Sequence, residues 1–276
     1  EIEPLAFGAS QTAFITAVAS ESRRGQYPRG FHGEQPYWTL VGVDGGGESG
    51  LMGEDGAIEL RRGGPSIEPF ILEDGRLTTW ADVNITQGLR DDDLPMPWVQ
   101  WQTDGLALRI ESFADGTPER SRLFGRYHLS NTSDRARTVT LALMARPYQV
   151  NGPRQFLAVP GGVGPIVQID WTGGELVLND DTRVRPLVRP DAVAASLFAS
   201  GADPHSLLTR PDRRQPVDTR LVQSDDGLMA GALFYEVTLQ PGETRQFGWM
   251  LPMAGTPDPL PVTGSVEAAL DAVEDA

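Results

Sequence analysis

The chain has 276 residues, of which 39% are hydrophobic and 22% charged, and its formal net charge is −15. A chain of this length and ordinary composition can bury a substantial core without disulfides or metal ions. Nucleic-acid-binding surfaces need clustered basic residues, but no run of consecutive basic residues in this chain is longer than the pair Arg213-Arg214. We therefore expect neither nucleic acid nor an anionic membrane as a partner.

All 23 basic residues are arginine, and the chain contains neither lysine nor cysteine. Schiff-base, pyridoxal-phosphate and P-loop chemistries need a lysine, and thiolate nucleophiles and zinc–thiolate sites need a cysteine, so all of these are excluded. No apolar run approaches the roughly 18–20 residues of a membrane span, and residues 1–20 lack a signal-peptide pattern. The chain begins without Met, so the alternative that a signal peptide has been removed stays open. We expect a soluble protein, cytoplasmic or periplasmic/secreted.

Short extended segments separated by glycine, proline, aspartate and asparagine dominate the chain. Residues 99–103 and 106–113 are predicted strands, and Asp104-Gly105 between them is the strongest short-range hairpin signal. The second strand alternates, with one face formed by Leu106, Leu108, Ile110 and Ser112 and the other by Ala107, Arg109, Glu111 and Phe113.

The next two predicted strands are residues 123–129 and 138–144, separated by a polar turn at residues 130–134. The first of them alternates, with Leu123, Gly125, Tyr127 and Leu129 on one face and Phe124, Arg126 and His128 on the other. Later strands are expected at residues 166–171, 175–178, 183–188, 233–239 and 245–251. Between the last two, the chemistry of Gln240-Pro241-Gly242-Glu243 is that of a turn.

Many short strands with such turns predict an all-β fold, a large antiparallel two-sheet β-sandwich over residues 1–264. The one segment with a helical pattern is residues 265–276, where Ser265 can cap a helix and Val266, Leu270 and Val273 recur at helical spacing. This segment is either a natural C-terminal helix or the start of a helical linker to a following domain, and we favour the linker.

Several motifs together resemble a known domain. They are Tyr37-Trp38-Thr39-Leu40-Val41-Gly42, Glu54-Asp55-Gly56, Ser66-Ile67-Glu68-Pro69-Phe70, Leu94-Pro95-Met96-Pro97 ahead of Trp101, Phe113-Ala114-Asp115-Gly116, Arg146-Pro147-Tyr148-Gln149-Val150-Asn151, Gln155-Phe156-Leu157 and Gly161-Gly162-Val163. The chain resembles the β-supersandwich domain that precedes a six-hairpin helical toroid in large bacterial glycoside-hydrolase-like proteins. Glucoamylases and the maltose and cellobiose phosphorylases share that architecture, and the supersandwich belongs to the galactose-mutarotase-like group of folds.

This resemblance implies a partner as well as a fold. In such proteins the catalytic carboxylates lie on the helical toroid, and a helical linker joins the two parts. The resemblance therefore implies a domain without catalytic residues of its own, packed against a following helical domain of the same chain. Fold likeness alone is a weak guide to chemistry, so the candidate residues are considered separately.

Histidines and carboxylates are the candidates for chemistry and metal binding. His32 and Glu34 could flank a sugar ring as the base and acid of a mutarotase-like reaction, although a loop histidine bonded to backbone is the alternative we favour. His128 shares a strand face with Arg126, and His205 lies in a loop. The run Asp91-Asp92-Asp93 could bind Ca²⁺, but its spacing does not match an EF-hand loop and a solvated acidic turn is the alternative. No other cofactor is expected.

Tryptophans give the best indication of a ligand, because an exposed indole can stack on the apolar face of a sugar ring. Trp38, Trp98 and Trp101 are the candidates. Trp98 and Trp101 differ by three positions in one predicted strand, so one should lie in the core and the other on the outer face. Core packing is the alternative for each of them.

We therefore expect a non-catalytic β-sandwich domain of a larger carbohydrate-active protein, packed against a helical catalytic domain and in contact with oligosaccharide. Two alternatives stay open, a stand-alone aldose-mutarotase-like enzyme and a carbohydrate-binding module. The enzyme requires a histidine and a carboxylate that converge on one sheet face. The binding module requires an exposed tryptophan without such an acid–base pair.

Overall fold

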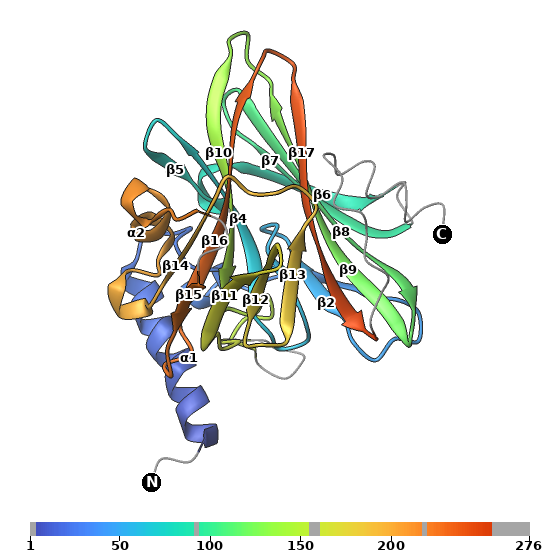
Figure 1. The fold of residues 1–276 in the computed structure, drawn as a ribbon, viewed down its shortest axis with the longest axis vertical. Helices are drawn as coiled ribbons and strands as arrows, with labels where there is room; N and C mark the ends of the chain where they lie inside the picture. The colour runs from blue at the N-terminus through green and yellow to red at the C-terminus, as the bar shows by residue number, and fades with distance from the viewer. Residues whose placement is uncertain (1–3, 91–93, 155–160, 217–219, 256–276) are drawn as a thin grey trace.

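The computed structural model of the chain describes residues 4–90, 94–154, 161–216 and 220–255. Within these ranges the strands form two sheets packed face to face, which confirms the predicted all-β two-sheet sandwich (Figure 1). The ladders between neighbouring strands are all antiparallel. The predicted helix at residues 265–276 lies outside the described residues.

The first sheet has eight strands in the order β1-β2-β3-β4-β10-β16-β14, with β5 paired to β4. Their bounds are β1 Trp38–Val41, β2 Gly50–Gly53, β3 Ile58–Glu59, β4 Ser66–Glu73, β5 Arg76–Thr78, β10 Arg137–Arg146, β14 Ala192–Ser196 and β16 Ala230–Leu239. Strand β1 ends the sheet on one side and pairs only with β2 among the described strands.

The second sheet has nine strands in the order β15-β11-β12-β13-β17-β9-β8-β7-β6. Their bounds are β6 Asn84–Arg90, β7 Leu94–Gln102, β8 Leu106–Thr117, β9 Arg120–Asn131, β11 Gln168–Thr172, β12 Glu175–Leu178, β13 Thr182–Pro186, β15 Arg220–Gln223 and β17 Thr244–Ala254. Each of the strands predicted from residue 99 to residue 251 corresponds to one of the observed strands.

The main hydrophobic core fills the space between the two sheets. The alternation in the sequence predicted which faces of β8 and β9 line this core. Leu106, Leu108 and Ile110 of β8 and Tyr127 of β9 are at most 3% exposed, as that alternation requires. The first sheet contributes the inward-facing residues of β4 and β10, although both of these strands are buried on their outer face as well. A pleated strand that packs on the core with one face therefore accounts for the period-2 pattern of β8 and β9.

The three predicted turns serve two different purposes. Asp104-Gly105 closes the β7–β8 hairpin as expected, with Gly105 in the left-handed region at φ +90°. Residues 130–134 and 240–243 instead carry the chain from one sheet to the other, because β9 pairs with β8 and β17 while β10 pairs with β4 and β16. The buried Asn131 holds these crossings together, donating from Nδ2 to the carbonyl oxygens of Arg135 (2.7 Å) and Leu239 (3.0 Å).

In the described part of the chain, two α-helices and four short 3-10 helices accompany the sheets: α1 Pro4–Glu21, α2 Pro204–Leu208, η1 Arg29–His32, η2 Trp80–Asp82, η3 Phe198–Ser200 and η4 Pro211–Arg213. The expectation of a helix only at the C-terminal end was wrong, because α1 has 18 residues. Between residues 11 and 21 of this helix, Ile15 and Ala19 are fully buried, whereas Phe14 is 49% exposed. Ile15 is the one large apolar side chain that is fully buried in that range, which gives too weak a helical period to recognise.

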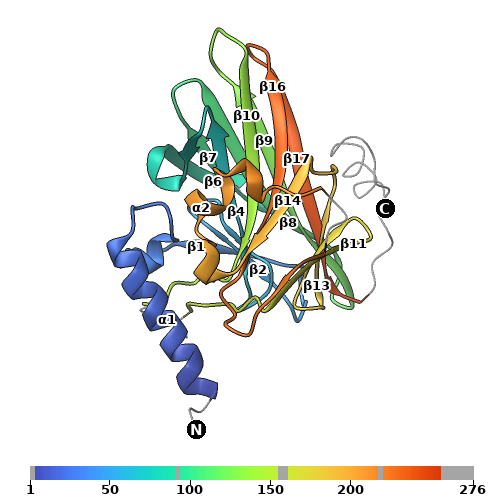
Figure 2. The same cartoon turned by 60° about the vertical axis from the view of Figure 1, so that its left-hand side comes forward.

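Both α-helices lie on the outer side of the eight-stranded sheet, and part of α1 projects beyond the sandwich (Figures 1 and 2). Leu207 and Leu208 of α2 pack on Phe70 and neighbouring small residues of that sheet. Ile15 and Ala19 of α1 join a second cluster with Tyr27, Phe31 and Tyr148. The outer face of this sheet is therefore a second packed layer. In the part of the chain that the structure describes, no helix is long and apolar enough to cross a membrane.

Candidate functional site

Strand register brings the polar face of the nine-stranded sheet into a regular arrangement over β7, β8, β9 and β17. One row across these strands is Trp98–Glu111–Arg126–Gly248, and the next is Gln100–Arg109–His128–Gln246. We call these eight residues the polar grid. Neighbouring side chains in such rows lie about 5 Å apart at Cβ, so one small ligand can touch several of them.

Glu111 is the centre of the grid's ionic contacts. Its Oε1 accepts a hydrogen bond from Nε of Arg109 at 2.8 Å, and its Oε2 accepts two from Arg126 at 2.9 and 2.6 Å. His128 Nε2 lies 3.5 Å from the same Oε2. Burial alone would raise the pKa of Glu111, but the surrounding imidazole and guanidinium groups outweigh it and hold the pKa well below the ordinary value of 4.5. The carboxyl is therefore ionised at neutral pH.

Trp98 and Arg109 form a stacked pair at one side of the grid. The guanidinium carbon of Arg109 lies 4.3 Å from the centroid of the Trp98 ring. Trp98 leans over Gly88 of β6, where a Cβ would come within 2.8 Å of the indole, and its Nε1 donates to the carbonyl oxygen of Leu89 at 3.1 Å. The aromatic ring thus supports a planar cation, a contact worth about 0.5–1 kcal/mol at an exposed position.

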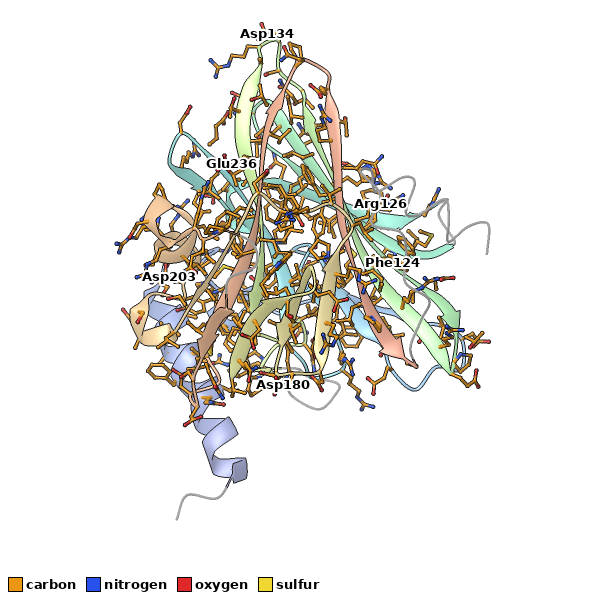
Figure 3. All side chains as sticks on the ribbon, viewed as in Figure 1. Phe124, Arg126, Asp134, Asp180, Asp203 and Glu236 are labelled. Carbon is orange, nitrogen blue, oxygen red and sulfur yellow. The ribbon has the colours of Figure 1, made fainter. Side chains whose placement is uncertain are left out.

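An apolar row borders the grid along the same strands. Phe113 and Phe124 lie opposite one another in the β8–β9 register and stack at 4.8 Å with an interplanar angle of 9°. Leu187 and Met250 complete this cluster. In Figure 3, Arg126 and Phe124 lie along β9, while Asp203 at the start of α2 lies on the opposite side of the view. The grid therefore has an apolar border on one side and faces away from the helical layer.

A separate cleft of about 580 Å³ lies where β4 and β5 meet the ends of β6, β7 and β8. Its volume would suit a small ligand. None of the described residues that line it is aromatic. They are Ile71, Glu73, Arg76, Thr78, Ala81, Asp82, Val83, Asn84, Gln102, Thr103, Asp104, Leu106 and Arg137. Glu73 is already paired with Arg137, and Asp82 with Arg23. Of these two sites, the grid is the stronger candidate for sugar recognition, because it joins an aromatic ring to charged donors and the described lining of the cleft does not.

The candidate pair His32 and Glu34 lies elsewhere, at η1 in the helical layer. His32 contacts the Trp80 ring edge-on at 6.4 Å, and burial lowers its pKa. Glu34 accepts hydrogen bonds from Nε and Nη2 of Arg24, and these lower the pKa of its carboxyl. No described hydrogen bond joins the two residues. An acid–base pair needs a proton that can be exchanged near working pH, and this arrangement instead favours a neutral imidazole beside an ion pair.

The three candidate tryptophans lie in three different environments. Trp101 is 1% exposed in the main core, and Nε1 donates to the carbonyl oxygen of Asp55 at 3.0 Å. Trp98 lies on the outer face, so the expectation that these two indoles occupy opposite faces is confirmed. Trp38 is 39% exposed on β1, beside Tyr37 (66%) and Leu40 (59%). Of the three, Trp101 has no surface to offer a sugar.

Asp91, Asp92 and Asp93 lie outside the described residues, so the calcium site stays a prediction. Within the described ranges, no three histidine or acidic side chains are grouped as metal ligands. His205 is exposed at the start of α2.

The structure assembles a site that the sequence did not reveal. Alternation placed Arg109 and Glu111 on one face of their strand and Arg126 and His128 on one face of the next. The missing information was the β8–β9 register, which sets Arg109 opposite His128 and Glu111 opposite Arg126. A signal was present nevertheless, because opposite charges on facing positions of consecutive strands favour one register.

The fold and this site define a large antiparallel β-sandwich with one helical layer and one polar, partly aromatic outer face. No protein-family model matches the chain, and no curated protein matches it. The similar solved structures include a bacterial glucoamylase complexed with acarbose, with 9% identity, a TM-score of 0.46, and coverage of 88% of this chain and 36% of the glucoamylase.

Two further similar structures have TM-scores of 0.35. One is described as a kojibiose phosphorylase from the human microbiome, with 12% identity over 75% of this chain and 24% of that protein. The other is a polysaccharide lyase, with 10% identity over 80% of this chain and 33% of the lyase. The chain therefore spans between 24% and 36% of the length of these proteins. Membership of the galactose-mutarotase-like group and a bacterial source stay predictions.

Proposed function

We propose that this chain is a non-catalytic β-sandwich domain of a carbohydrate-active protein and that it contacts carbohydrate through the polar grid. The observation that carries the proposal is the meeting of an indole, two guanidinium groups and an imidazole on adjacent strands. Apolar surface suits the C–H faces of a sugar ring, and polar groups that converge on one place suit its hydroxyls. The resemblance of the sequence motifs to sugar-acting proteins supports the same class of ligand.

The state of Glu111 favours binding over catalysis. The grid does bring a histidine and a carboxylate together, as the mutarotase-like alternative requires, with His128 Nε2 and Glu111 Oε2 3.5 Å apart. A general acid or base works best when its pKa lies near the working pH. The pKa of Glu111 is held far below that range, and both of its oxygens already accept hydrogen bonds. Such a carboxylate is a weak base that orients its cations.

Replacing Trp98 by alanine is expected to weaken oligosaccharide binding about tenfold, because Arg109 loses the ring on which it is stacked. Isothermal calorimetry of the 276-residue chain against neutral and acidic oligosaccharides measures the change. Trp38→Ala is the matched control, since it removes an exposed indole on the other sheet. Loss of binding in Trp38→Ala alone would refute the grid as the site, and no binding of any sugar by the parent chain would refute the carbohydrate proposal.

We also propose that the edge formed by Tyr37, Trp38 and Leu40 packs against a helical domain of the same protein. Tyr37 is 66% exposed, Trp38 39% and Leu40 59%, and the three lie within four consecutive positions of the chain. Trp38 and Leu40 lie two positions apart on β1 and so share one face of the strand, and exposed apolar side chains that share a surface mark interaction sites. The edge position of β1 supports this role, because the end of a sheet is exposed unless something covers it.

The double substitution Trp38→Ser and Leu40→Ser is expected to weaken association with a separately expressed helical domain by about thirtyfold or more, as at an interface hot spot. Analytical ultracentrifugation or calorimetry of the two domains measures the affinity. Val167→Ser is a control, because Val167 is an exposed apolar residue (38%) next to β11 of the other sheet. Equal affinities for the parent and the double variant would exclude this edge from the interface.

A further inference from the structure

We propose that the polar grid recognises an anionic sugar, one whose ring bears a carboxylate or a phosphate. The inference rests on the proposed function, since it names the class of sugar that the same face takes. Two guanidinium groups flank a single carboxylate there, and these three groups together are positive at neutral pH. The chain as a whole carries a net charge of −15, so this balance is the reverse of the average surface.

The arginine donors of the grid are only partly used. Glu111 accepts from Nε of Arg109, and from Nε and Nη2 of Arg126. No described residue accepts a hydrogen bond from either Nη of Arg109 or from Nη1 of Arg126. These groups lie on side chains that are 34% and 17% exposed. A guanidinium with a free edge can bind a planar carboxylate or a phosphate with two parallel hydrogen bonds.

The arginines are also held in place before a ligand arrives. Arg109 is fixed on one side by the Trp98 ring at 4.3 Å and on the other by Glu111. Arg126 is fixed by two hydrogen bonds to Glu111 Oε2. A flexible surface arginine loses rotamer freedom when it binds an anion, and a fixed one does not. Glu111 thus reduces the net positive charge but orients the donors.

Among the described residues of the strands that carry the grid, neighbouring charges do not cancel this effect. Asp115, the next acidic residue on β8, lies opposite Arg122 and is paired with it. In the strand register, Gln100 and Gln246 lie at the two ends of the row that contains Arg109 and His128. Side-chain amides suit the hydroxyl groups of a sugar, whereas a simple inorganic anion has no use for them. This combination of a guanidinium and an imidazole between amides is the reason for choosing a sugar that carries the anionic group.

Calorimetric titration of the 276-residue chain with trigalacturonate, glucose 6-phosphate and maltotriose at low salt tests the inference. We expect at least one of the two anionic sugars to bind about tenfold or more tightly than neutral maltotriose, and its affinity to fall as sodium chloride is added. The comparison of trigalacturonate with glucose 6-phosphate identifies the anionic group. Equal affinities for anionic and neutral sugars would overturn the inference but leave the proposed carbohydrate function intact. The absence of binding to any sugar would overturn both.

Arg126→Gln is expected to abolish the preference for the anionic sugar, and Arg210→Gln is the matched control. Arg210 is paired with Asp212 on an exposed segment, and its side chain is 55% exposed. Arg109→Gln provides a second test with the same expected loss if Arg126→Gln does not fold. An equal loss of affinity in Arg210→Gln would show that only overall charge matters, and would overturn the inference.

Discussion

Replacing Arg146 by methionine is expected to lower the free energy of unfolding by about 3–5 kcal/mol. Arg146 is completely buried on the outer side of β10, where Nη1 donates to Glu68 Oε2 at 2.9 Å. Glu68 is itself only 4% exposed. Without the guanidinium, a carboxylate would stay buried with no opposite charge beside it. Removing one partner of a buried ion pair is costly for that reason, even where the intact pair contributes little.

Arg146 also attaches the N-terminal segment to the sheet. Its Nη2 donates to the carbonyl oxygen of Gln26 at 2.7 Å, and its guanidinium lies 5.4 Å from the Tyr27 ring and 4.5 Å from the Tyr148 ring. Arg146 is therefore one of the groups that join the helical layer to the eight-stranded sheet. Arg146→Met should accordingly increase amide hydrogen exchange around Gln26 more than exchange in the core strands.

Urea unfolding followed by tryptophan fluorescence measures the loss of stability. Arg210→Met is the control, because the side chain is 55% exposed and its loss should leave stability unchanged. The double variant Arg146→Met with Glu68→Met should recover part of the loss, since no buried charge is left without a partner. A single variant within about 1 kcal/mol of the parent would contradict the argument, because that change is ordinary for any buried position.

The sequence predicted β8 and β9 well because each of these strands follows a local rule. A strand that packs on one face alternates, and the alternating residues of β8 and β9 fell on the faces where the structure has them. The assignment of strands to sheets follows no local rule. The turns at residues 130–134 and 240–243 look like hairpin turns, yet each crosses between sheets, since the partners of β10 and β17 lie far away in the sequence.

The same distinction explains which parts of the candidate site could be predicted. Trp98 was a candidate because an exposed indole can stack on a sugar ring, and its spacing of three from Trp101 predicted that one of the two would lie on the outer face. Arg109 and Arg126 became candidates only when the register placed both beside Glu111. The hydrogen bond between Arg126 and Glu111 links residues 15 positions apart in the sequence. Helix α1 was missed for a different reason. Between residues 11 and 21 of the helix, Ile15 is the one large apolar side chain that is fully buried, so this part shows little helical periodicity of hydrophobic residues.

The contrast between Trp101 and Trp98 tests these assignments within one strand. Trp101→Ala is expected to cost about 3–5 kcal/mol of unfolding free energy, because it removes a large buried ring and leaves a cavity. It also leaves the Asp55 carbonyl oxygen without its indole donor. That oxygen belongs to a tight turn in which Gly56 has φ +84° and a Cβ would lie 2.3 Å from Ile110, so the turn has little freedom to close the cavity.

Trp98→Ala, three positions away, should cost only about 1 kcal/mol, since it loses a half-exposed cation–π contact and one hydrogen bond on the outer face. Chemical unfolding of both variants, followed by circular dichroism to avoid the missing fluorophore, gives the two values under identical conditions. Equal losses of stability would mean that both indoles are core residues, and the polar grid would then lose its aromatic platform. A large loss for Trp101→Ala alone would separate the two tryptophans, one needed for the fold and the other available for ligand binding.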